Sequence, residues 1–260
     1  MPQRLAIPAD VAAALVRVGG DLSEFALDVH WYGVVGSTND VAGALAEQGA
    51  GEGVVVVADQ QTAGRGRLGR TWASPPGAGL YVSVVLRPPS HVAPLLTIAA
   101  GVAVADGIAS ATGLDVQLKW PNDVHVSGRK LAGILAEGAP RYVVLGIGIN
   151  VMPAAYPPDV ATRATSIESE LGRPIDRGMV LAEVLAALAS RYRELSTEGG
   201  RGVIDAWRRR AASTLGRRVE WDGGGEARLG LIENIDEDGA LIVRSGSELV
   251  RIRSGEVRWI

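Results

Sequence analysis

The sequence predicts an α+β fold, in which a mixed or antiparallel sheet packs against helices and a small all-β domain follows. Two observations support this. First, apolar runs of strand length follow one another as hairpins, without the regular strand–helix alternation of a parallel α/β protein. Second, the helical periodicity stops near Gly216, and short apolar runs separated by Gly, Asp and Ser continue to the end of the chain.

Helical patterns occur in segments that begin or end at residues typical of helix ends. Cap-type residues from Ser37 to Asp40 open an Ala-rich helix, and Gly113 closes a long apolar one. The expected helices are Pro8–Gly19, the helix that begins at Ser37, Pro94–Thr112, Gly178–Leu195 and Val203–Leu215.

Strands are expected where β-branched and other apolar residues run together between turn residues. Those of the larger domain are Leu27–Tyr32, Val54–Ala58, Leu80–Leu86, Val116–Trp120, Val124–Val126, Leu131–Glu137 and Tyr142–Val151. Those of the small domain are Leu229–Ile232, Ala240–Val243 and Leu249–Ile252, in a pattern typical of a small antiparallel barrel or sandwich. We therefore divide the chain into domains 1–213 and 214–260.

Composition excludes several classes of protein. The net charge of −3 gives no reason to expect binding to nucleic acid or to an anionic membrane. The absence of cysteine excludes a disulfide framework, a thiolate metal site and a cysteine nucleophile. His30, His91 and His125 are far apart, so no metal site is expected. No signal peptide follows the N-terminus, and apolar stretches are interrupted short of the roughly 20 residues of a membrane span, so we expect a soluble cytoplasmic protein.

The strongest local feature is the segment Gly64–Arg70, which reads Gly-Arg-Gly-Arg-Leu-Gly-Arg and is called here the Arg–Gly loop. Its glycines let backbone N–H groups approach a ligand, and its arginines offer forked donors to phosphate or carboxylate oxygens. No Asp or Glu occurs between Gln60 and Ala105, so we expect its charge to be uncompensated. A solvated surface loop is the alternative. Nucleic-acid binding is less favoured, because no aromatic residue interrupts the loop.

Lys130 begins the second strand of an expected hairpin that turns at Ser127-Gly128. With a period of two, Lys130 shares a face with Ala132, Ile134 and Ala136. A lysine at the head of an apolar strand face either extends to solvent or is placed at a ligand. We favour the ligand, because the Arg–Gly loop and a strand marked by glycines accompany it.

The strand marked by glycines is Tyr142–Val151, on which Val144, Gly146, Gly148 and Asn150 share one face. Glycine within a strand often marks the close approach of a ligand or of another backbone. Asn150 offers both a donor and an acceptor, which suits a purine edge or a ribose. The alternative is tight packing of this face against the helix Pro94–Thr112.

Taken together, these motifs resemble the biotin–protein ligase family. The resemblance spans roughly residues 27 to 155, with the motifs in that family's order and spacing. The motifs are Ser37-Thr38-Asn39, Gln61 with Gly64–Arg70, Lys119-Trp120-Pro121-Asn122-Asp123, Arg129–Leu135 and Gly146–Asn150. The resemblance implies a class II synthetase-like catalytic domain and a small SH3-like β-barrel. Residues 1–26 are too few for a helix-turn-helix with its recognition helix, so we expect the enzyme-only class without a DNA-binding domain.

The resemblance also implies the roles of particular residues. Lys130 and Arg67 would be catalytic, through charge rather than as a general base. The biotin-binding residues would be Ser37, Thr38, Asn39, Gln61, Arg65, Gly66, Arg67 and Lys130. The ATP-binding residues would be Arg70, Asn122, Asp123 and Asn150, with Mg²⁺ arriving with ATP and no dedicated metal ligands.

The implied reaction joins biotin to ATP as biotinyl-5'-AMP and transfers the biotin to a lysine of a biotin carboxyl carrier domain. Because the adenylate must survive until that lysine arrives, the Arg–Gly loop is expected to be mobile when empty and ordered when occupied. We expect no nucleic-acid or membrane partner, and a monomer or weak homodimer. Two alternatives stay open: a relative that transfers lipoate or octanoate, and a biotin sensor without catalysis.

Overall fold

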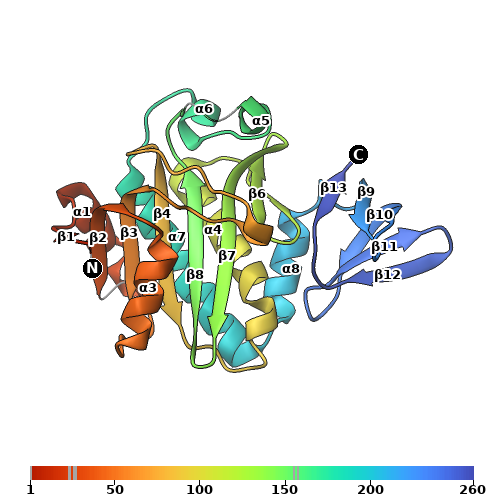
Figure 1. Cartoon of the computed structure of the whole chain (residues 1–260), viewed down its shortest axis with the longest axis horizontal. Helices are drawn as coiled ribbons and strands as arrows, with labels where there is room; N and C mark the ends of the chain where they lie inside the picture. The colour runs from red at the N-terminus through yellow and green to blue at the C-terminus, as the bar shows by residue number, and fades with distance from the viewer. Residues whose placement is uncertain (1, 23–24, 26–27, 155, 157) are drawn as a thin grey trace.

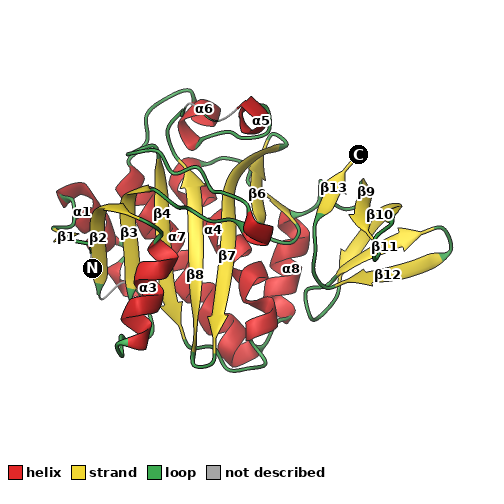
Figure 2. Cartoon of the chain, viewed as in Figure 1, coloured by secondary structure: helices red, strands yellow, loops and turns green. Residues whose placement is uncertain are grey.

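The computed structural model describes residues 2–22, 25, 28–154, 156 and 158–260, with the side chains at 158 and 159 excepted. The chain forms an eight-stranded sheet and, towards its C-terminus, a separate five-stranded sheet (Figure 1). Helices cover both faces of the larger sheet (Figure 2). The α+β class predicted from the sequence is therefore confirmed.

The larger sheet has the order β1-β2-β3-β4-β8-β7-β6-β5. Only β2 and β3 are parallel, and the other neighbours are antiparallel. Its strands are β1 (Arg4–Leu5), β2 (Val29–Val35), β3 (Val55–Gln61), β4 (Gly79–Leu86), β5 (Gln117–Lys119), β6 (Asp123–Val126), β7 (Arg129–Ala139) and β8 (Tyr142–Asn150). The strand expected to begin at Leu27 begins at Val29 in the structure, and Leu27 itself lies outside the described residues.

The helices form one layer in front of the sheet and a thicker one behind it (Figure 1). In front, α3 packs over β3, β4 and β8, whereas behind the sheet α4 contacts β5, β6 and β7 and is itself covered by α7. The helices are α1 (Ala9–Arg17), α2 (Gly19–Leu22), α3 (Thr38–Glu47), α4 (Leu96–Thr112), α5 (Pro158–Ala161), α6 (Ile167–Leu171), α7 (Arg177–Glu198) and α8 (Arg201–Arg210), with 3₁₀ turns at Arg67–Gly69 and Ala93–Leu95.

Helix α4 is the central helix of the core. A Cβ at Gly107 would overlap the backbone of Val184 in α7, so the two helices approach closely only because this residue is glycine. Together with the turn before it, α4 forms a stretch of 20 residues, Ala93–Thr112, that contains an 18-residue window with a mean hydropathy of 1.6, and 67% of that window is buried. The expectation that no apolar stretch reaches the length of a membrane span is wrong here. Length and composition alone do not distinguish a span from a buried core helix.

The C-terminal sheet is antiparallel, with the order β12-β11-β10-β9-β13. Its strands are β9 (Arg218–Asp222), β10 (Ala227–Ile235), β11 (Leu241–Ser245), β12 (Glu248–Ile252) and β13 (Val257–Trp259). Among the described residues β12 and β13 do not pair with each other, so the small sheet is not a closed barrel and an SH3-like barrel is not confirmed. The buried indole of Trp120 donates a hydrogen bond of 2.9 Å to the carbonyl of Gly239, which joins the two sheets.

Candidate active site

A cavity opens on the front face of the larger sheet, between the N-terminal end of α3, the Arg–Gly loop and the β6–β7 hairpin. Residues 255–257, at the start of β13 in the C-terminal domain, close one side of it. Of the residues predicted for the site, those that line the cavity are Ser37, Thr38, Asn39, Gln61, Arg65, Gly66, Arg67, Arg70, Asn122, Asp123 and Lys130. Asn150 is not among the lining residues; its side chain donates a hydrogen bond of 2.9 Å to the carbonyl of Thr165.

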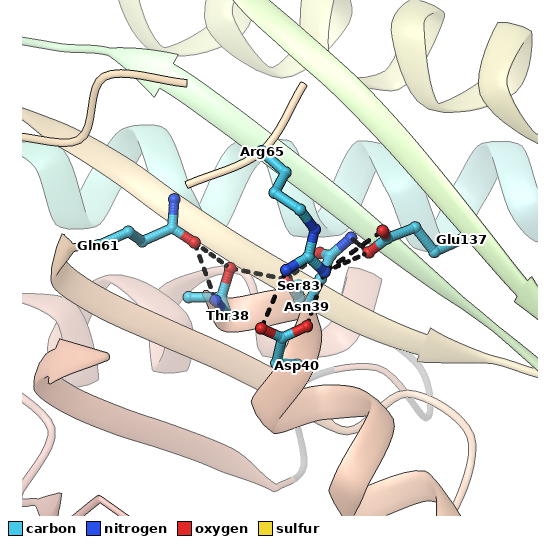
Figure 3. A network of polar contacts seen from close by, with 7 residues as sticks. All are labelled: Thr38, Asn39, Asp40, Gln61, Arg65, Ser83 and Glu137. Carbon is cyan, nitrogen blue, oxygen red and sulfur yellow. Dashed lines mark hydrogen bonds and ion pairs between the residues drawn. The ribbon is translucent and has the colours of Figure 1, made fainter. Parts of the chain in front are cut away.

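Thr38 and Gln61 form the first part of a polar network at one end of the cavity (Figure 3). The side-chain oxygen of Gln61, at the end of β3, accepts hydrogen bonds from the backbone N–H of Thr38 at 2.8 Å and from its hydroxyl at 3.0 Å. The amide nitrogen of Gln61 donates to the Ser74 hydroxyl at 2.9 Å. The orientation of the Gln61 amide is therefore fixed from both ends.

Asn39 is held between two strands of the sheet. Its amide nitrogen donates to Glu137 on β7 at 2.6 Å, and its oxygen lies 2.6 Å from the Ser83 hydroxyl on β4. A Cβ at Gly146 on β8 would overlap this side chain. Gly146 therefore leaves room for the side chain of Asn39, and this close neighbour is neither the ligand nor the backbone that was predicted for the glycine.

Arg65 is neutralised by two carboxylates from outside the loop (Figure 3). Its guanidinium makes two hydrogen bonds to Asp40, at 2.7 and 2.9 Å, and two to Glu137, at 3.1 and 3.3 Å. These hydrogen bonds raise the pKa of Arg65 above its usual value. The expectation that the loop charge is uncompensated is therefore wrong for Arg65, because its partners lie 25 and 72 residues away along the chain.

The other two arginines of the loop differ from Arg65. Arg70 forms an ion pair with Glu256, which immediately precedes β13 of the C-terminal sheet. Arg67 is half-buried and lies 3.4 Å from the Asn122 side-chain oxygen, and among the described residues no carboxylate pairs with it. Burial lowers the pKa of Arg67, and the charges of Asp123 and Glu256 oppose that shift. Arg67 is thus the arginine of the loop with charge available to a ligand.

Lys130 lies on the cavity side of β7, but not in the register expected from a period of two. A bulge at Leu131 shifts the β6–β7 pairing, so that Lys130 pairs with His125 and Ala132 pairs with Val124. Lys130 therefore shares its face with Gly133, whose added Cβ would lie 3.4 Å from the lysine Nζ. The prediction that it shares a face with Ala132, Ile134 and Ala136 is wrong, because those residues face the core behind the sheet.

The Lys130 ammonium lies 2.6 Å from Asp123. Burial raises the pKa of Asp123, but His125 and Lys130 outweigh it and bring the value to about 2, so this carboxylate is ionised at neutral pH. Lys119 also lines the cavity, and its pKa is lowered by burial and by repulsion from Lys130 and Arg163. Positive charge therefore gathers at this end of the cavity.

Trp72 covers the glycines of the two central strands. A Cβ at Gly148 would overlap its indole, and one at Gly133 would lie 3.0 Å from it. The Lys130 ammonium lies 5.3 Å from the indole centroid. The Trp72 Nε1 is buried without a hydrogen-bond partner among the described residues. The alternative that these glycines admit helix α4 is wrong, because α4 packs on the opposite face of the sheet.

Several residues of the site are not predicted as site residues from the sequence. Lys119 stands inside a predicted motif, and Trp72 lies two residues after the Arg–Gly loop, so proximity to a motif is the available signal. Nothing in the local sequence marks Ser83, Glu137 or Glu256, because they meet the residues of the site from distant parts of the chain. The residues not predicted include Trp72, Ser83, Lys119, Glu137 and Glu256.

Across the described parts of the chain, no group of three or more His, Cys, Asp or Glu residues is placed to hold a metal ion. Asp123 and Glu256 are the carboxylates among the residues that line the cavity, and each is paired with a cation.

Comparison with known proteins assigns the chain to a family. The model of the biotin/lipoate A/B protein ligase family matches residues 32–152, and the model of the biotin protein ligase C-terminal domain matches residues 214–258. The bifunctional ligase/repressor BirA of Bacillus subtilis is 34% identical over 259 residues, which cover 96% of this chain and 79% of that protein.

Two further relatives support the same family assignment. The biotin–[acetyl-CoA-carboxylase] ligase of Mycobacterium tuberculosis is 38% identical over 230 residues, which cover 85% of this chain and 85% of that protein. The structure of the biotin protein ligase from Aquifex aeolicus in complex with biotin and ATP is similar with a TM-score of 0.80 at 30% identity, covering 90% of this chain and 99% of that one. By sequence and by fold, the chain belongs to the biotin protein ligase family.

Proposed function

We propose that the protein activates biotin with ATP to biotinyl-5'-AMP and transfers the biotin to a lysine of a biotin carboxyl carrier domain. The observation that carries this is the division of one cavity into two ends. Fixed neutral amides and hydroxyls lie around Thr38 and Gln61, and Arg67, Lys119 and Lys130 gather at the other end. Such a cavity suits a ligand with a neutral polar ring and an anionic tail.

The charged end matches the first chemical step. A carboxylate attacks a phosphate slowly in water because two anions must approach each other. Preorganised cations lower that barrier without a general base. Lys130, held against Asp123, and Arg67, free of a carboxylate partner among the described residues, supply this charge. Asp123, ionised at neutral pH, keeps the Lys130 ammonium oriented.

Mg²⁺ would enter this site with ATP. Magnesium is commonly bound by one or two carboxylates together with substrate phosphates, and it would neutralise phosphate charge when bound. Asp123 and the neighbouring Asn122 offer oxygens of the kind that Mg²⁺ prefers, and the described residues provide no dedicated cage. The residues present therefore fit a metal carried by the nucleotide.

The Arg–Gly loop would retain the adenylate until the acceptor lysine arrives. Its first arginine, Arg65, forms ion pairs with Asp40 on α3 and Glu137 on β7. Its last, Arg70, forms an ion pair with Glu256 in the C-terminal domain. The small sheet thus takes part in forming the site, and we propose that it corresponds to the SH3-like module of the family. A cytoplasmic location and a monomer or weak homodimer are part of the same proposal.

One assay tests the function. The protein is incubated with biotin, ATP and a biotin carboxyl carrier domain, and the release of diphosphate and the mass of the carrier are measured. We expect diphosphate release that depends on biotin and a carrier heavier by one biotinyl group. Diphosphate release without carrier labelling would indicate a sensor that forms the adenylate. Activity with lipoate or octanoate in place of biotin would indicate the other branch of the family, and a carrier whose acceptor lysine is replaced by arginine is the control.

A further inference from the structure

Lys130 is held by a segment that does not belong to the sheet. Residues 163–166, called here the strap, run alongside the first residues of β7. The backbone N–H of Lys130 donates to the carbonyl of Arg163 at 2.7 Å, and its carbonyl accepts from the N–H of Thr165 at 2.9 Å. Lys130 and Ala164 thereby form an isolated parallel bridge. Both backbone hydrogen-bonding groups of Lys130 are satisfied by the strap.

The strap replaces β8 at this point of the sheet. Strand β8 pairs with β7 from Ala139 only as far as Ala132, so its ladder ends before Lys130. The bulge at Leu131 separates the start of β7 from the rest of the strand. On the other side Lys130 still pairs with His125 of β6, but on the β8 side the strap supplies the hydrogen bonds that a regular strand would otherwise make.

The strap is fixed in turn by buried side chains. Asn150, the last residue of β8, donates to the carbonyl of Thr165 at 2.9 Å. Thr165 is 3% exposed, and its hydroxyl donates to the carboxylate of Glu170 on the short helix α6. The backbone and the side chain of Thr165 thus connect Lys130 to two different elements.

Glu170 also binds the turn of the β6–β7 hairpin. Its carboxylate pairs with Arg129 at 2.7 Å and accepts from the Ser127 hydroxyl at 3.2 Å, and its side chain is only 9% exposed. A buried carboxylate is costly unless it is hydrogen-bonded and paired, and this one meets both conditions. Glu170 therefore links the strap and the hairpin on both sides of Lys130.

We propose that Glu170, acting through Thr165 and the strap, is a positioning residue for Lys130. It keeps the lysine backbone where the ammonium meets Asp123 at 2.6 Å over the indole of Trp72. A flexible lysine stem reaches a fixed point only if its backbone is fixed, and small displacements in a site that works by charge are costly in rate. The expected loss of rate rests on the proposed function, whereas the expected displacement of Lys130 does not.

The kinetic test uses Glu170→Ala, with Glu168→Ala as the matched control. Glu168 lies on the same helix, and its carboxylate accepts from the backbone of Ile175 instead of the hairpin. We expect Glu170→Ala to lower kcat for biotinyl-AMP formation about tenfold or more with the KM for biotin within about twofold, because the polar end is untouched. Glu170→Gln keeps an acceptor for Thr165 and should restore most of the rate. In a Lys130→Ala background, Glu170→Ala should have no further effect.

A structural readout does not need activity. Lys119 and Lys130 are the only lysines in the sequence, so acylation by an amine-reactive ester, followed by mass spectrometry, reports on each separately. We expect Glu170→Ala, and the nearly isosteric Thr165→Val, to change the reactivity of Lys130 relative to Lys119 severalfold, with Glu168→Ala unchanged. Thr165→Val keeps the test valid if Glu170→Ala fails to fold.

Three results would overturn the proposal: an unchanged ratio of lysine reactivities in both variants, additive effects of Glu170→Ala and Lys130→Ala, or an equal loss in Glu168→Ala. A wild-type protein that forms no biotinyl-AMP would refute the proposed function instead, and the ratio of lysine reactivities would still decide the role of the strap.

Discussion

The two ends of the cavity are built in different ways. At the polar end, Thr38, Asn39 and Gln61 are joined by short hydrogen bonds to Ser74, Ser83 and Glu137, and the cation Arg65 is neutralised by two carboxylates. At the cationic end, Arg67, Lys119 and Lys130 lie around the carboxylate of Asp123, and the other lining carboxylate, Glu256, is paired with Arg70.

The difference shows which interactions each end can offer a ligand. Groups that are already hydrogen-bonded in fixed orientations select the shape and the polarity of a neutral ring at little ordering cost. Unbalanced charge in a partly buried site stabilises charge that develops during a reaction. Changes at the polar end should therefore act mainly on binding, and changes at the cationic end mainly on rate.

The largest effect is expected for Lys130→Ala. If Lys130 stabilises the charge that develops between the biotin carboxylate and the α-phosphate, adenylate formation should fall by two or more orders of magnitude, on the order of 3 kcal/mol. Diphosphate release in single turnovers measures it, and a thermal melt checks the fold. Lys119→Ala is the comparison: equal losses would mean that the number of charges matters rather than the position of Lys130. Near-normal diphosphate release by Lys130→Ala would remove the proposed role.

Arg67→Gly should have a smaller effect of a different kind. The substitution removes an arginine that has no carboxylate partner in the described part of the chain, and it adds backbone freedom. Biotinyl-AMP should therefore leave about tenfold faster or more, as expected for the loss of one charge-assisted contact of roughly 1.5–3 kcal/mol. ATP and biotin are still consumed, and the freed adenylate labels bystander amines. Stopped-flow release and biotin on added albumin are the measurements. Release at the wild-type rate and unlabelled albumin would mean that the loop does not retain the intermediate.

The sequence predicts some features of the two ends of the cavity and not others. The glycine face of β8 follows from a period of two because β8 is regular from Tyr142 to Asn150. The face on which Lys130 lies does not follow from a period of two, because a single bulge at Leu131 reverses the alternation. The residues around Leu131 do not predict this bulge. The SH3-like barrel expected from the resemblance is not a closed barrel among the described residues.

The charge balance of the Arg–Gly loop is harder to predict from the sequence. No acidic residue stands near Arg65 in the local sequence, yet its partners are Asp40 and Glu137, and Arg70 pairs with Glu256, which lies 186 residues away. These ion pairs depend on how the two sheets assemble, so the sequence around the loop does not predict them. For the same reason the strap that holds Lys130 could not be predicted from the hairpin alone.

At the polar end, Gln61→Ala should raise the KM for biotin about three- to tenfold with little change in kcat. The variant leaves the N–H and hydroxyl of Thr38 without their acceptor, and an unsatisfied buried donor costs about 1–3 kcal/mol, part of which water regains in an open cavity. Initial rates at saturating ATP separate the two constants. A loss confined to kcat would contradict the division of the cavity into a binding end and a rate end.

The smallest effect expected is on stability in acid, through Asp123. Its pKa in the folded protein is about 2, below its ordinary value of 3.8, because Lys130 and His125 outweigh the cost of burial. A carboxyl group with a lowered folded pKa contributes stability that is complete above the unfolded value and is lost as the pH falls from about 4 towards 2. The full contribution of such a shift is about 2.4 kcal/mol in the ideal case, and solvent screening at a partly open cavity reduces it. Urea unfolding of the wild type and of Asp123→Asn between pH 6 and pH 2 isolates this contribution, since all other carboxylates cancel in the difference. The stability gap between the two proteins should narrow below pH 4. A gap that stays constant across this range would mean that Asp123 is not held ionised by its cationic neighbours, and the orientation of Lys130 would then need another cause.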